Sequence, residues 1–353
     1  MAAKSRPQEL EPATLTEIRT QPAAWREAIQ VVGERAHDLC DLWASGKYAQ
    51  VIFTGCGSTY YLALAASALF QELTGKPARG VPAGELVMVP GAAYPTNGRT
   101  LLVAVSRSAA TTETLQAVKA FHRDRQGEVV AVTNYGDRPL TATAAVTIAI
   151  PSGQEQSIAQ TRSFASMYVA TTTMAAILAG RNDLVSEMER LPAAGHRLLS
   201  TYDDLAQATG SNLALDRFYF LGSGTRYGLA CEANLKMKEM TLTHSEPFHF
   251  LEFRHGPKSM VGPTTLVIGL LSEANRAHEE AVLEEMRSLG AAVLSLAESQ
   301  ADVAFDSRLP EPARNVLYLP VLQMMAYYRS IAKGLDPDQP HNLDAVVELE
   351  WEG

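Results

Sequence analysis

Cysteine is scarce in this chain. Cys40, Cys56 and Cys231 are odd in number and lie far apart in a sequence of 353 residues. Such usage excludes a disulfide framework and a paired CxxC zinc site. We therefore expect a protein of the reducing cytoplasm.

Positive charge is also in short supply. Lys and Arg number 30 against 39 Asp and Glu, which gives a formal net charge of −9. Without a stripe of Lys and Arg, the chain lacks the phosphate-neutralising surface on which nucleic-acid binding depends. We expect no nucleic-acid partner, so that any anionic ligand must be held locally by backbone amides and a few hydroxyl groups.

Long apolar runs are missing as well. The stretch 168–180 is far short of a bilayer span, and the N-terminal residues have no apolar core of the signal-peptide type. We expect no membrane association. Hydrophobic residues nevertheless make up 46% of the chain, and this length is typical of about two domains with buried cores.

The chain contains an internal repeat. Residues 53–72 align without a gap on residues 220–239, and the pairs Gly55/Gly222 and Gly57/Gly224 match. Each copy is followed by two further apolar runs. These runs are TLLVAVS and VVAVTN in the first copy, and TLVIGLLS and AAVLSLA in the second.

Short runs of Val, Ile and Leu that alternate with helical patterns are typical of βαβ units in a parallel sheet buried on both faces. We predict an α/β protein with two such sheets. The predicted order is a helical lead-in over 1–44, a first unit over 45–182, a helical connector over 183–210, and a second unit with a C-terminal tail over 211–353.

Two loops rich in Gly, Ser and Thr stand where ligands bind in an open parallel sheet, beyond the carboxyl ends of strands. One runs from Gly55 to Thr59 and the other from Ser106 to Glu113. Free amides of a helix's first turn, with nearby hydroxyls, suit a phosphate monoester. Either loop alone is more readily explained as a helix N-cap than as a ligand site, but the pair favours a ligand. No Walker A or dinucleotide motif occurs.

The helix predicted after Gly224 carries a charged stripe. Glu232, Lys236 and Glu239 are spaced i, i+4 and i+7, which places them on one face. A solvated surface with i,i+4 pairing is the ordinary explanation. The repeat weakens it, because the first copy has mainly apolar residues at the equivalent positions, namely Ala65, Leu69 and Glu72.

Three of the eight histidines lie in the segment 244–257. A zinc site there would rest on composition alone, because Pro247 breaks the helix and the spacings are not HExxH. His255 precedes Gly-Pro, a turn position that suits the presentation of an imidazole to a cleft.

Five motifs in order resemble the sugar isomerase (SIS) family. They are GCGST (55–59), SRSAATTET (106–114), EQSIAQTRSF (155–164), EANLKMKEMTLTHSEPFHFLEFRHGP (232–257) and DPDQPHNL (336–343). The chain is most similar to the isomerase half of glucosamine-6-phosphate synthase and its stand-alone relatives, the hexosamine-6-phosphate deaminase/isomerases and fructosamine-6-phosphate deglycases. The resemblance covers roughly residues 45–345.

The resemblance implies two tandem SIS domains, each a five-stranded parallel sheet flanked by helices in a flavodoxin-like three-layer arrangement. It implies that Glu239 moves a proton between C1 and C2 of a sugar 6-phosphate, and that His255 opens the ring from the partner subunit of a homodimer. Glu232 and Lys236 would line the same pocket. The implied phosphate ligands are Ser58, Thr59, Ser106, Arg107, Ser108 and Thr111. The implied sugar-lining residues are Cys56, Gly57, Glu155, Ile158, Ala159 and Gln160.

The chain departs from the family pattern at three places. The family lysine that forms a Schiff base with the ketose falls at Ala345, which leaves Lys333 or Lys236 as substitutes. Ala109 and Ala110 replace Gly-Glu in the phosphate loop, and Arg107 stands in place of Gln, where its charge could strengthen phosphate binding. The chain begins MAAK, without the synthase's glutaminase domain, so we expect no glutaminase activity.

Aldose–ketose interconversion requires ring opening and abstraction of a proton α to a carbonyl, for which a His and a Glu suffice without metal or cofactor. The leading hypothesis is an amino-sugar 6-phosphate deaminase/isomerase. A fructosamine-6-phosphate deglycase and a simple phosphosugar isomerase are alternatives within the same class. A non-catalytic sugar-phosphate-binding regulator is the alternative outside it.

Overall fold

The computed structural model describes residues 12–94, 98–125 and 127–347. Its strands form two sheets that are parallel throughout. The first sheet has the order β2-β1-β3-β4-β5 and the second the order β7-β6-β8-β9-β10, which is the same winding repeated. The prediction of two five-stranded parallel sheets is therefore confirmed. The strands are β1 (Gln50–Gly55), β2 (Ala78–Pro82), β3 (Thr100–Ser106), β4 (Gly127–Thr133), β5 (Val146–Ala149), β6 (Arg217–Leu221), β7 (His244–Phe248), β8 (Thr265–Leu270), β9 (Ala292–Ala297) and β10 (Val303–Ala304).

Helices precede, connect and cover the sheets. In the first half they are α1 (Ala13–Glu34), α2 (Ala36–Gly46), α3 (Ser58–Thr74), α4 (Ala83–Met88), α5 (Pro90–Ala93), α6 (Thr112–Asp124) and α7 (Arg162–Leu178). Between the halves lie α8 (Asn182–Met188), α9 (Leu191–Thr201) and α10 (Asp203–Gly210). In the second half they are α11 (Thr225–Thr241), α12 (Phe250–Phe253), α13 (Arg276–Ser288), α14 (Glu311–Arg314) and α15 (Leu319–Ala332). Short 3-10 turns cover Pro139–Thr143, Pro151–Gly153, Pro257–Met260 and Asn315–Tyr318.

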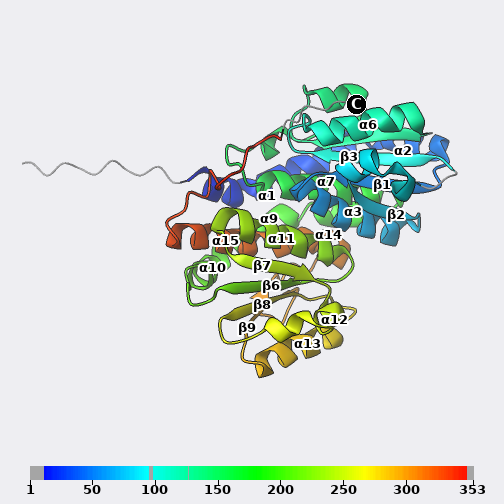
Figure 1. Cartoon of the computed structure of the whole chain (residues 1–353). Coiled ribbons are helices and arrows are strands. Elements are labelled where there is room, and N and C mark those ends of the chain that lie inside the picture. The colour runs from blue at the N-terminus through cyan, green and yellow to red at the C-terminus, as the bar shows by residue number, and fades with distance from the viewer. Residues whose placement is uncertain (1–11, 95–97, 126, 348–353) are drawn as a thin grey trace, which may run out of the picture.

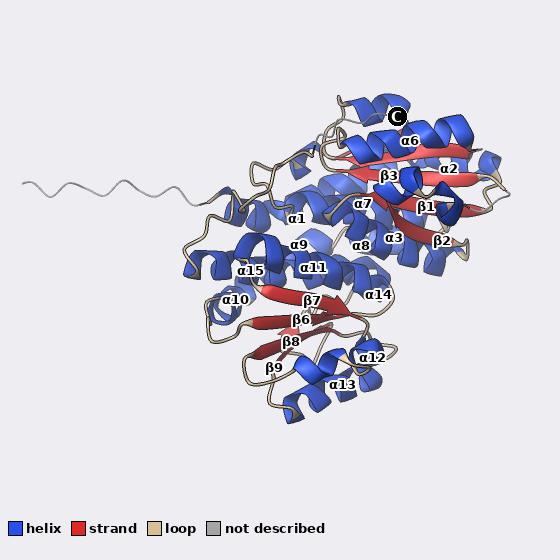
Figure 2. Ribbon diagram, viewed as in Figure 1, coloured by secondary structure: helices blue, strands red, loops and turns tan. Residues whose placement is uncertain are grey.

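A shared helical layer separates the two sheets. α1, α3, α7, α11 and α15 lie between them, whereas α6 covers the outer face of the first sheet and α13 that of the second (Figures 1 and 2). Because both faces are covered, every residue of the central strands β3 and β8 is buried. This explains why these strands read as unbroken apolar runs in the sequence.

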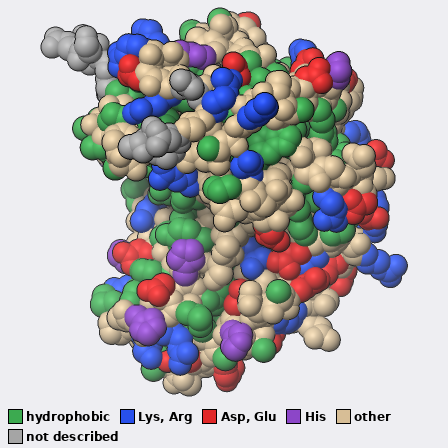
Figure 3. Space-filling view, turned by 90° about the vertical axis from the view of Figure 1, so that its right-hand side faces the viewer, with side chains coloured by type: hydrophobic (Ala, Val, Ile, Leu, Met, Phe, Trp, Pro, Cys, Tyr) green, Lys and Arg blue, Asp and Glu red, His purple; other side chains and the backbone are tan. Residues whose placement is uncertain are grey.

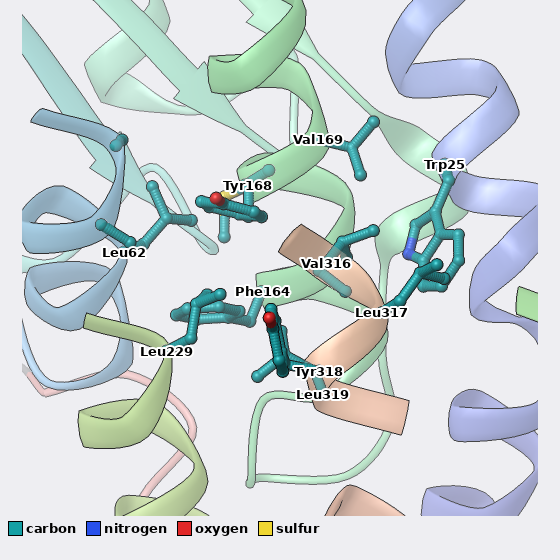
Figure 4. Packing of buried hydrophobic residues seen from close by; sticks show 14 of the residues in the cluster. Trp25, Leu62, Phe164, Tyr168, Val169, Leu229, Val316, Leu317, Tyr318 and Leu319 are labelled. Carbon is teal, nitrogen blue, oxygen red and sulfur yellow. The ribbon is translucent and has the colours of Figure 1, made fainter. Parts of the chain in front are cut away.

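The main core joins the two halves of the chain. Trp25 of α1, Leu62 of α3, Phe164 of α7 and Leu229 of α11 all belong to one cluster of buried side chains, seen from close by in Figure 4. α7, which contains most of the apolar stretch 168–180, is buried in this layer. Within the described ranges, no helix combines the length and apolarity that crossing a membrane requires.

The two copies meet where α3 packs on α11. A Cβ at Gly228 of α11 would lie 2.5 Å from the backbone nitrogen of Ala65 and 2.7 Å from the carbonyl oxygen of Tyr61, both in α3. Only glycine permits so close an approach of two helix backbones. The beginning of α3 consequently lies beside the charged stripe of α11.

Candidate active site

The GxG loops need glycine, either for its backbone conformation or because a side chain would not fit. Gly57 and Gly224 precede α3 and α11 with φ of 55° and 57°, a left-handed conformation that strains any other residue. A Cβ at Gly55 would lie 2.5 Å from Oγ1 of Thr59. The loop therefore turns sharply and brings the first turn of α3 close to the end of β1.

The charged stripe of α11 is buried against the start of α3. Lys236, whose side chain is 1% exposed, lies 3.2 Å from Oε1 of Glu232 and forms a second ion pair with Glu239. Ser58 connects the two copies, because its hydroxyl donates to Glu232 (3.2 Å) and accepts from the Lys236 ammonium (3.1 Å). The stripe is therefore an interior cluster rather than a solvated face.

Burial sets the charge state of this cluster. Desolvation raises the pKa of Glu232 to about 8, against the opposing effect of Lys236. Burial by itself would lower the pKa of Lys236, but the two carboxylates outweigh burial and raise it. Near neutral pH the cluster thus holds a protonated Glu232 next to the Lys236–Glu239 ion pair. A carboxylic acid, an ammonium and a carboxylate side by side can donate and accept protons over one substrate.

The second loop gathers hydroxyls at the end of β3. The hydroxyl of Thr111 lies 3.3 Å from that of Ser106 and 3.5 Å from that of Ser108. Ala109 adopts φ of 52°, the conformation that glycine would adopt without strain. Three hydroxyls at the start of α6 form the donor set expected for a phosphate.

The GCGST loop uses part of its polar capacity on itself. The Thr59 hydroxyl donates to the carbonyl of Cys56 and accepts from its amide, both at 2.9 Å. The Cys56 thiol lies 3.6 Å from the hydroxyl of Thr114 in α6, and burial raises its pKa to about 11. Thr59 therefore holds the turn, and Cys56 links the two predicted ligand loops.

The hydrogen bonds of the Arg107 guanidinium do not go to the hydroxyl ring formed by Ser106, Ser108 and Thr111. Its guanidinium donates to the carbonyls of Ser157 (3.2 Å), Ile158 (2.8 Å) and Ala345 (2.9 Å), and lies 3.6 Å from the Glu155 carboxylate. The structure thus places Arg107 at the sugar-lining loop that the sequence predicted over Glu155–Gln160.

Glu155 begins this loop and fixes the start of α7. It accepts from the amides of Thr161 (2.8 Å) and Ser163 (3.1 Å) and from the Thr161 hydroxyl (2.9 Å). Ala159 is 2% exposed, and the Gln160 amide oxygen lies 3.5 Å from the Ser163 hydroxyl. The carboxylate of Glu155 is thus committed to the backbone and to Arg107.

A cavity of about 200 Å³ opens between the phosphate loop, the sugar-lining loop and the C-terminal tail. It adjoins a wider groove that reaches the start of α1. Sequence reasoning missed Glu17, Tyr135 and Arg138, which come from separate segments with no recognisable motif. It also passed over Gln156, which lies within the EQSIAQTRSF motif. Glu17 is buried and accepts from the amides of Gln156 (2.6 Å) and Ser157 (3.3 Å).

His255 lies apart from these residues within the chain. It is exposed on the turn after α12, and α12 lies on the opposite face of the second sheet from α11 (Figure 1). The neighbouring His249 stacks on Tyr227 of α11 with ring centroids 3.8 Å apart. The fold thus brings together Ser58, Glu232, Lys236 and Glu239, but not His255.

The two lysines considered as Schiff-base substitutes have different surroundings. The Lys333 ammonium donates to the carbonyls of Thr241 (2.6 Å) and Leu242 (3.3 Å), where α11 ends. Lys236 lies within the candidate site. Ala345, where the resemblance placed the family lysine, lines the cavity through the tail.

The equivalent crevice of the second copy is filled by ion pairs. Arg226, which corresponds to Thr59, contacts Glu311 and lies 3.9 Å from Glu279. Glu279 accepts from the amide of Ser272 at 2.6 Å. The chain's own carboxylates thus compensate the charge of Arg226 at this place in the second copy.

Two further kinds of site were considered, a metal-binding cluster among the described residues and a basic patch on the face drawn in Figure 3. Among the described residues, no three or more His, Cys, Asp and Glu side chains stand together as metal ligands. Acidic and basic side chains are interspersed on the face drawn in Figure 3.

The fold is a tandem α/β arrangement with a loop of three hydroxyls in the first copy and a buried Glu–Lys–Glu cluster in the second. The SIS domain model matches residues 47–179 and 215–329. The chain therefore belongs to the SIS domain family, the phosphosugar isomerase family.

Curated relatives align along most of the chain. It is 28% identical to a glutamine–fructose-6-phosphate aminotransferase of Methanothermobacter thermautotrophicus and 30% identical to that of Aeropyrum pernix, over 95% of this chain in each case. The chain spans 57% of the length of these two relatives.

Two solved structures share its whole architecture. A glucosamine-6-phosphate deaminase from Thermotoga maritima superposes with a TM-score of 0.79 at 28% identity, covering 96% of this chain and 100% of that one. A tagatose-6-phosphate ketose/aldose isomerase from Escherichia coli gives a TM-score of 0.85 at 22% identity over 100% of both chains, a similarity of fold.

Proposed function

We propose that this chain is an amino-sugar 6-phosphate deaminase/isomerase that converts a hexosamine 6-phosphate into a ketose 6-phosphate and ammonia. The observation that carries the proposal is the buried cluster in which Lys236 bridges Glu232 and Glu239 while Ser58 joins it to the phosphate-loop half. The name of the deaminase from Thermotoga maritima, at 28% identity over the whole fold, supports the same assignment.

The proposed chemistry uses groups on both copies. The hydroxyls of Ser106, Ser108 and Thr111 bind the phosphate. Glu239, held by Lys236, takes the proton from C2 of the open-chain sugar and returns it at C1. The enol amine formed first becomes an imine at C2, which water hydrolyses to the ketose and ammonia. Phosphate binding fixes the sugar so that both carbons face one carboxylate.

Ring opening is assigned to His255 of a second copy. Within one chain His255 is exposed and remote from α11, with Leu251 (55% exposed) and Met260 (53% exposed) close to it in sequence. A homodimer that covers this surface would deliver the imidazole to the neighbouring site. The active site would then need two chains.

Ammonia release tests the assignment. Purified protein is incubated with glucosamine 6-phosphate, galactosamine 6-phosphate and a fructosamine 6-phosphate, and ammonia, free amine and ketose are measured. Ammonia from a hexosamine phosphate supports the proposal. Amine released only from the fructosamine phosphate would make the chain a deglycase, and binding by calorimetry without turnover would make it a regulator.

Mixing two inactive variants tests the shared site. Glu239→Gln and His255→Ala should each lose at least about 100-fold in kcat, the usual size of an acid–base contribution. If His255 serves the partner, mixed dimers contain one site with both residues intact, and activity returns toward about a quarter of wild type. Failure of the mixture to recover, with subunit exchange verified by mass, would place both residues in one chain's site.

A further inference from the structure

Arg107 connects three segments that lie far apart in the sequence. It follows Ser106 at the end of β3, and its side chain is 9% exposed. One guanidinium nitrogen donates to the carbonyls of Ser157 and Ile158, and the other donates to the carbonyl of Ala345. The phosphate loop, the sugar-lining loop and the C-terminal tail therefore meet at one side chain.

The geometry requires a guanidinium. Arginine presents donors in a planar fork that can reach acceptors on two sides at once, whereas a lysine ammonium acts as a point charge. A buried charge also needs compensation. Glu155 supplies it at 3.6 Å, and Glu155 is itself fixed by the amides of Thr161 and Ser163.

A second anchor holds the same tail. The Asp338 carboxylate accepts from the amides of Ala13 and Thr14, both at 2.8 Å, at the start of α1. The Asp338 carbonyl accepts from the amide of Ile158 at 3.0 Å. Figure 1 shows the tail running from α15 past the beginning of α1 to the first half of the molecule. Between the two anchors, the sugar-lining loop is clamped against the tail.

The clamp shapes the cavity. Ala345 and Val346 form one wall, Ser108 and Ala110 another, and Ser157 a third. The acceptors of the Arg107 guanidinium are backbone carbonyls of these walls. Loss of the guanidinium would free the tail wall from the phosphate-loop wall.

We propose that Arg107 is a positioning residue that fixes the tail and the sugar-lining loop around the substrate's sugar, and that the loop hydroxyls bind the phosphate without it. The proposal deepens the proposed function and rests on it for the identity of the substrate. It predicts that Arg107 affects recognition of the sugar part and leaves recognition of the phosphate group nearly unchanged.

Hydrogen exchange of the unliganded protein tests the clamp without any substrate. The amides of Gln156, Ser157 and Ile158 are hydrogen bonded, so the peptide 155–161 reports on the loop. Arg107→Gln should speed its exchange by about tenfold or more, the effect expected for loss of hydrogen bonds to a charged group. Arg123→Gln removes the same charge from an exposed pair on α6 and should leave this peptide unchanged. Unchanged exchange in Arg107→Gln, with a wild-type melting temperature, would overturn the proposal.

Two ligands separate positioning from phosphate binding. Calorimetry should show glucosamine 6-phosphate binding weakened about tenfold in Arg107→Gln, while inorganic phosphate binding changes less than about twofold. Asp338→Asn, which is remote from the hydroxyl ring, should reproduce this split, and Arg107→Lys should not restore sugar binding. Equal weakening for both ligands, with rescue by lysine, would make Arg107 a phosphate ligand instead. No binding of either ligand to wild type would refute the proposed function, and the exchange result would still decide the clamp.

Discussion

The protonation state of Glu232 makes a sharp prediction about stability and pH. Burial raises the pKa of this carboxyl from its ordinary 4.5 to about 8. In the unfolded chain the carboxyl ionises near its ordinary value, so between these two pH values the folded state holds the extra proton. Folding stability therefore falls as pH rises across this window. At about 1.4 kcal/mol per pH unit between pH 4.5 and about 8, the loss amounts to up to about 5 kcal/mol.

Glu232→Gln removes that titration and keeps the shape. Glutamine resembles the protonated acid and retains an oxygen for Ser58 and Lys236. We expect the variant to match wild type within about 1 kcal/mol at pH 5 and to exceed it by up to about 5 kcal/mol at pH 9. The assay is urea unfolding at five pH values, with the difference in unfolding free energy plotted against pH.

Glu284→Gln serves as the matched control. Its carboxylate is 73% exposed and pairs with Arg287 on α13, and surface pairs of this kind contribute little. The difference from wild type should stay flat with pH. If the Glu232→Gln difference were also flat, or if the variant lost stability relative to wild type toward high pH, Glu232 would be ionised already at pH 5 as a partner of Lys236, and the reasoning would fail.

Three further changes have expected outcomes. Glu239→Gln should lower kcat at least about 100-fold with KM within about threefold, measured by ammonia release, because a proton-transfer group acts in the transition state. Gly57→Ala should cost about 1–2 kcal/mol in urea unfolding from its left-handed φ alone, since nothing lies near the added Cβ, whereas Gly84→Ala in helix α4 should not destabilise. Gly228→Ala should cost about 1–3 kcal/mol and weaken ligand binding, because its Cβ would force α11 away from Ala65 of α3. Unchanged stability in Gly228→Ala would show that the two helices separate freely.

The central strands could be predicted from sequence, and the edge strands could not. β3 and β8 are unbroken apolar runs because both sheet faces are covered. β2 reads ARGVP and β7 reads HSEPF, with no run of Val, Ile or Leu. An edge strand tolerates proline and polar residues, so these two are set by pairing with β1 and β6 rather than by their own composition.

The part of the candidate site that consists of contacts between side chains could be predicted from the sequence. The charged stripe stood out because the repeat supplied an apolar reference at Ala65 and Leu69. Phosphate binding by Arg107 stays a prediction from the resemblance. In the structure its guanidinium donates to backbone carbonyls of residues 157, 158 and 345, which every residue possesses. A sequence pattern does not mark a carbonyl as an acceptor, so only the folded chain reveals this set.

The α3–α11 packing has a consequence for symmetry. If the two copies were separate, identical subunits, a residue placed at position 232 of one subunit would also occur at the equivalent position of the other. The charged stripe of each subunit would then pack against the same charged stripe of its partner. Joining the copies in one chain removes that constraint, because position 65 stays alanine while position 232 becomes glutamate. Because the two copies are linked in one chain, α3 can keep small apolar residues at the interface while α11 carries the charged residues.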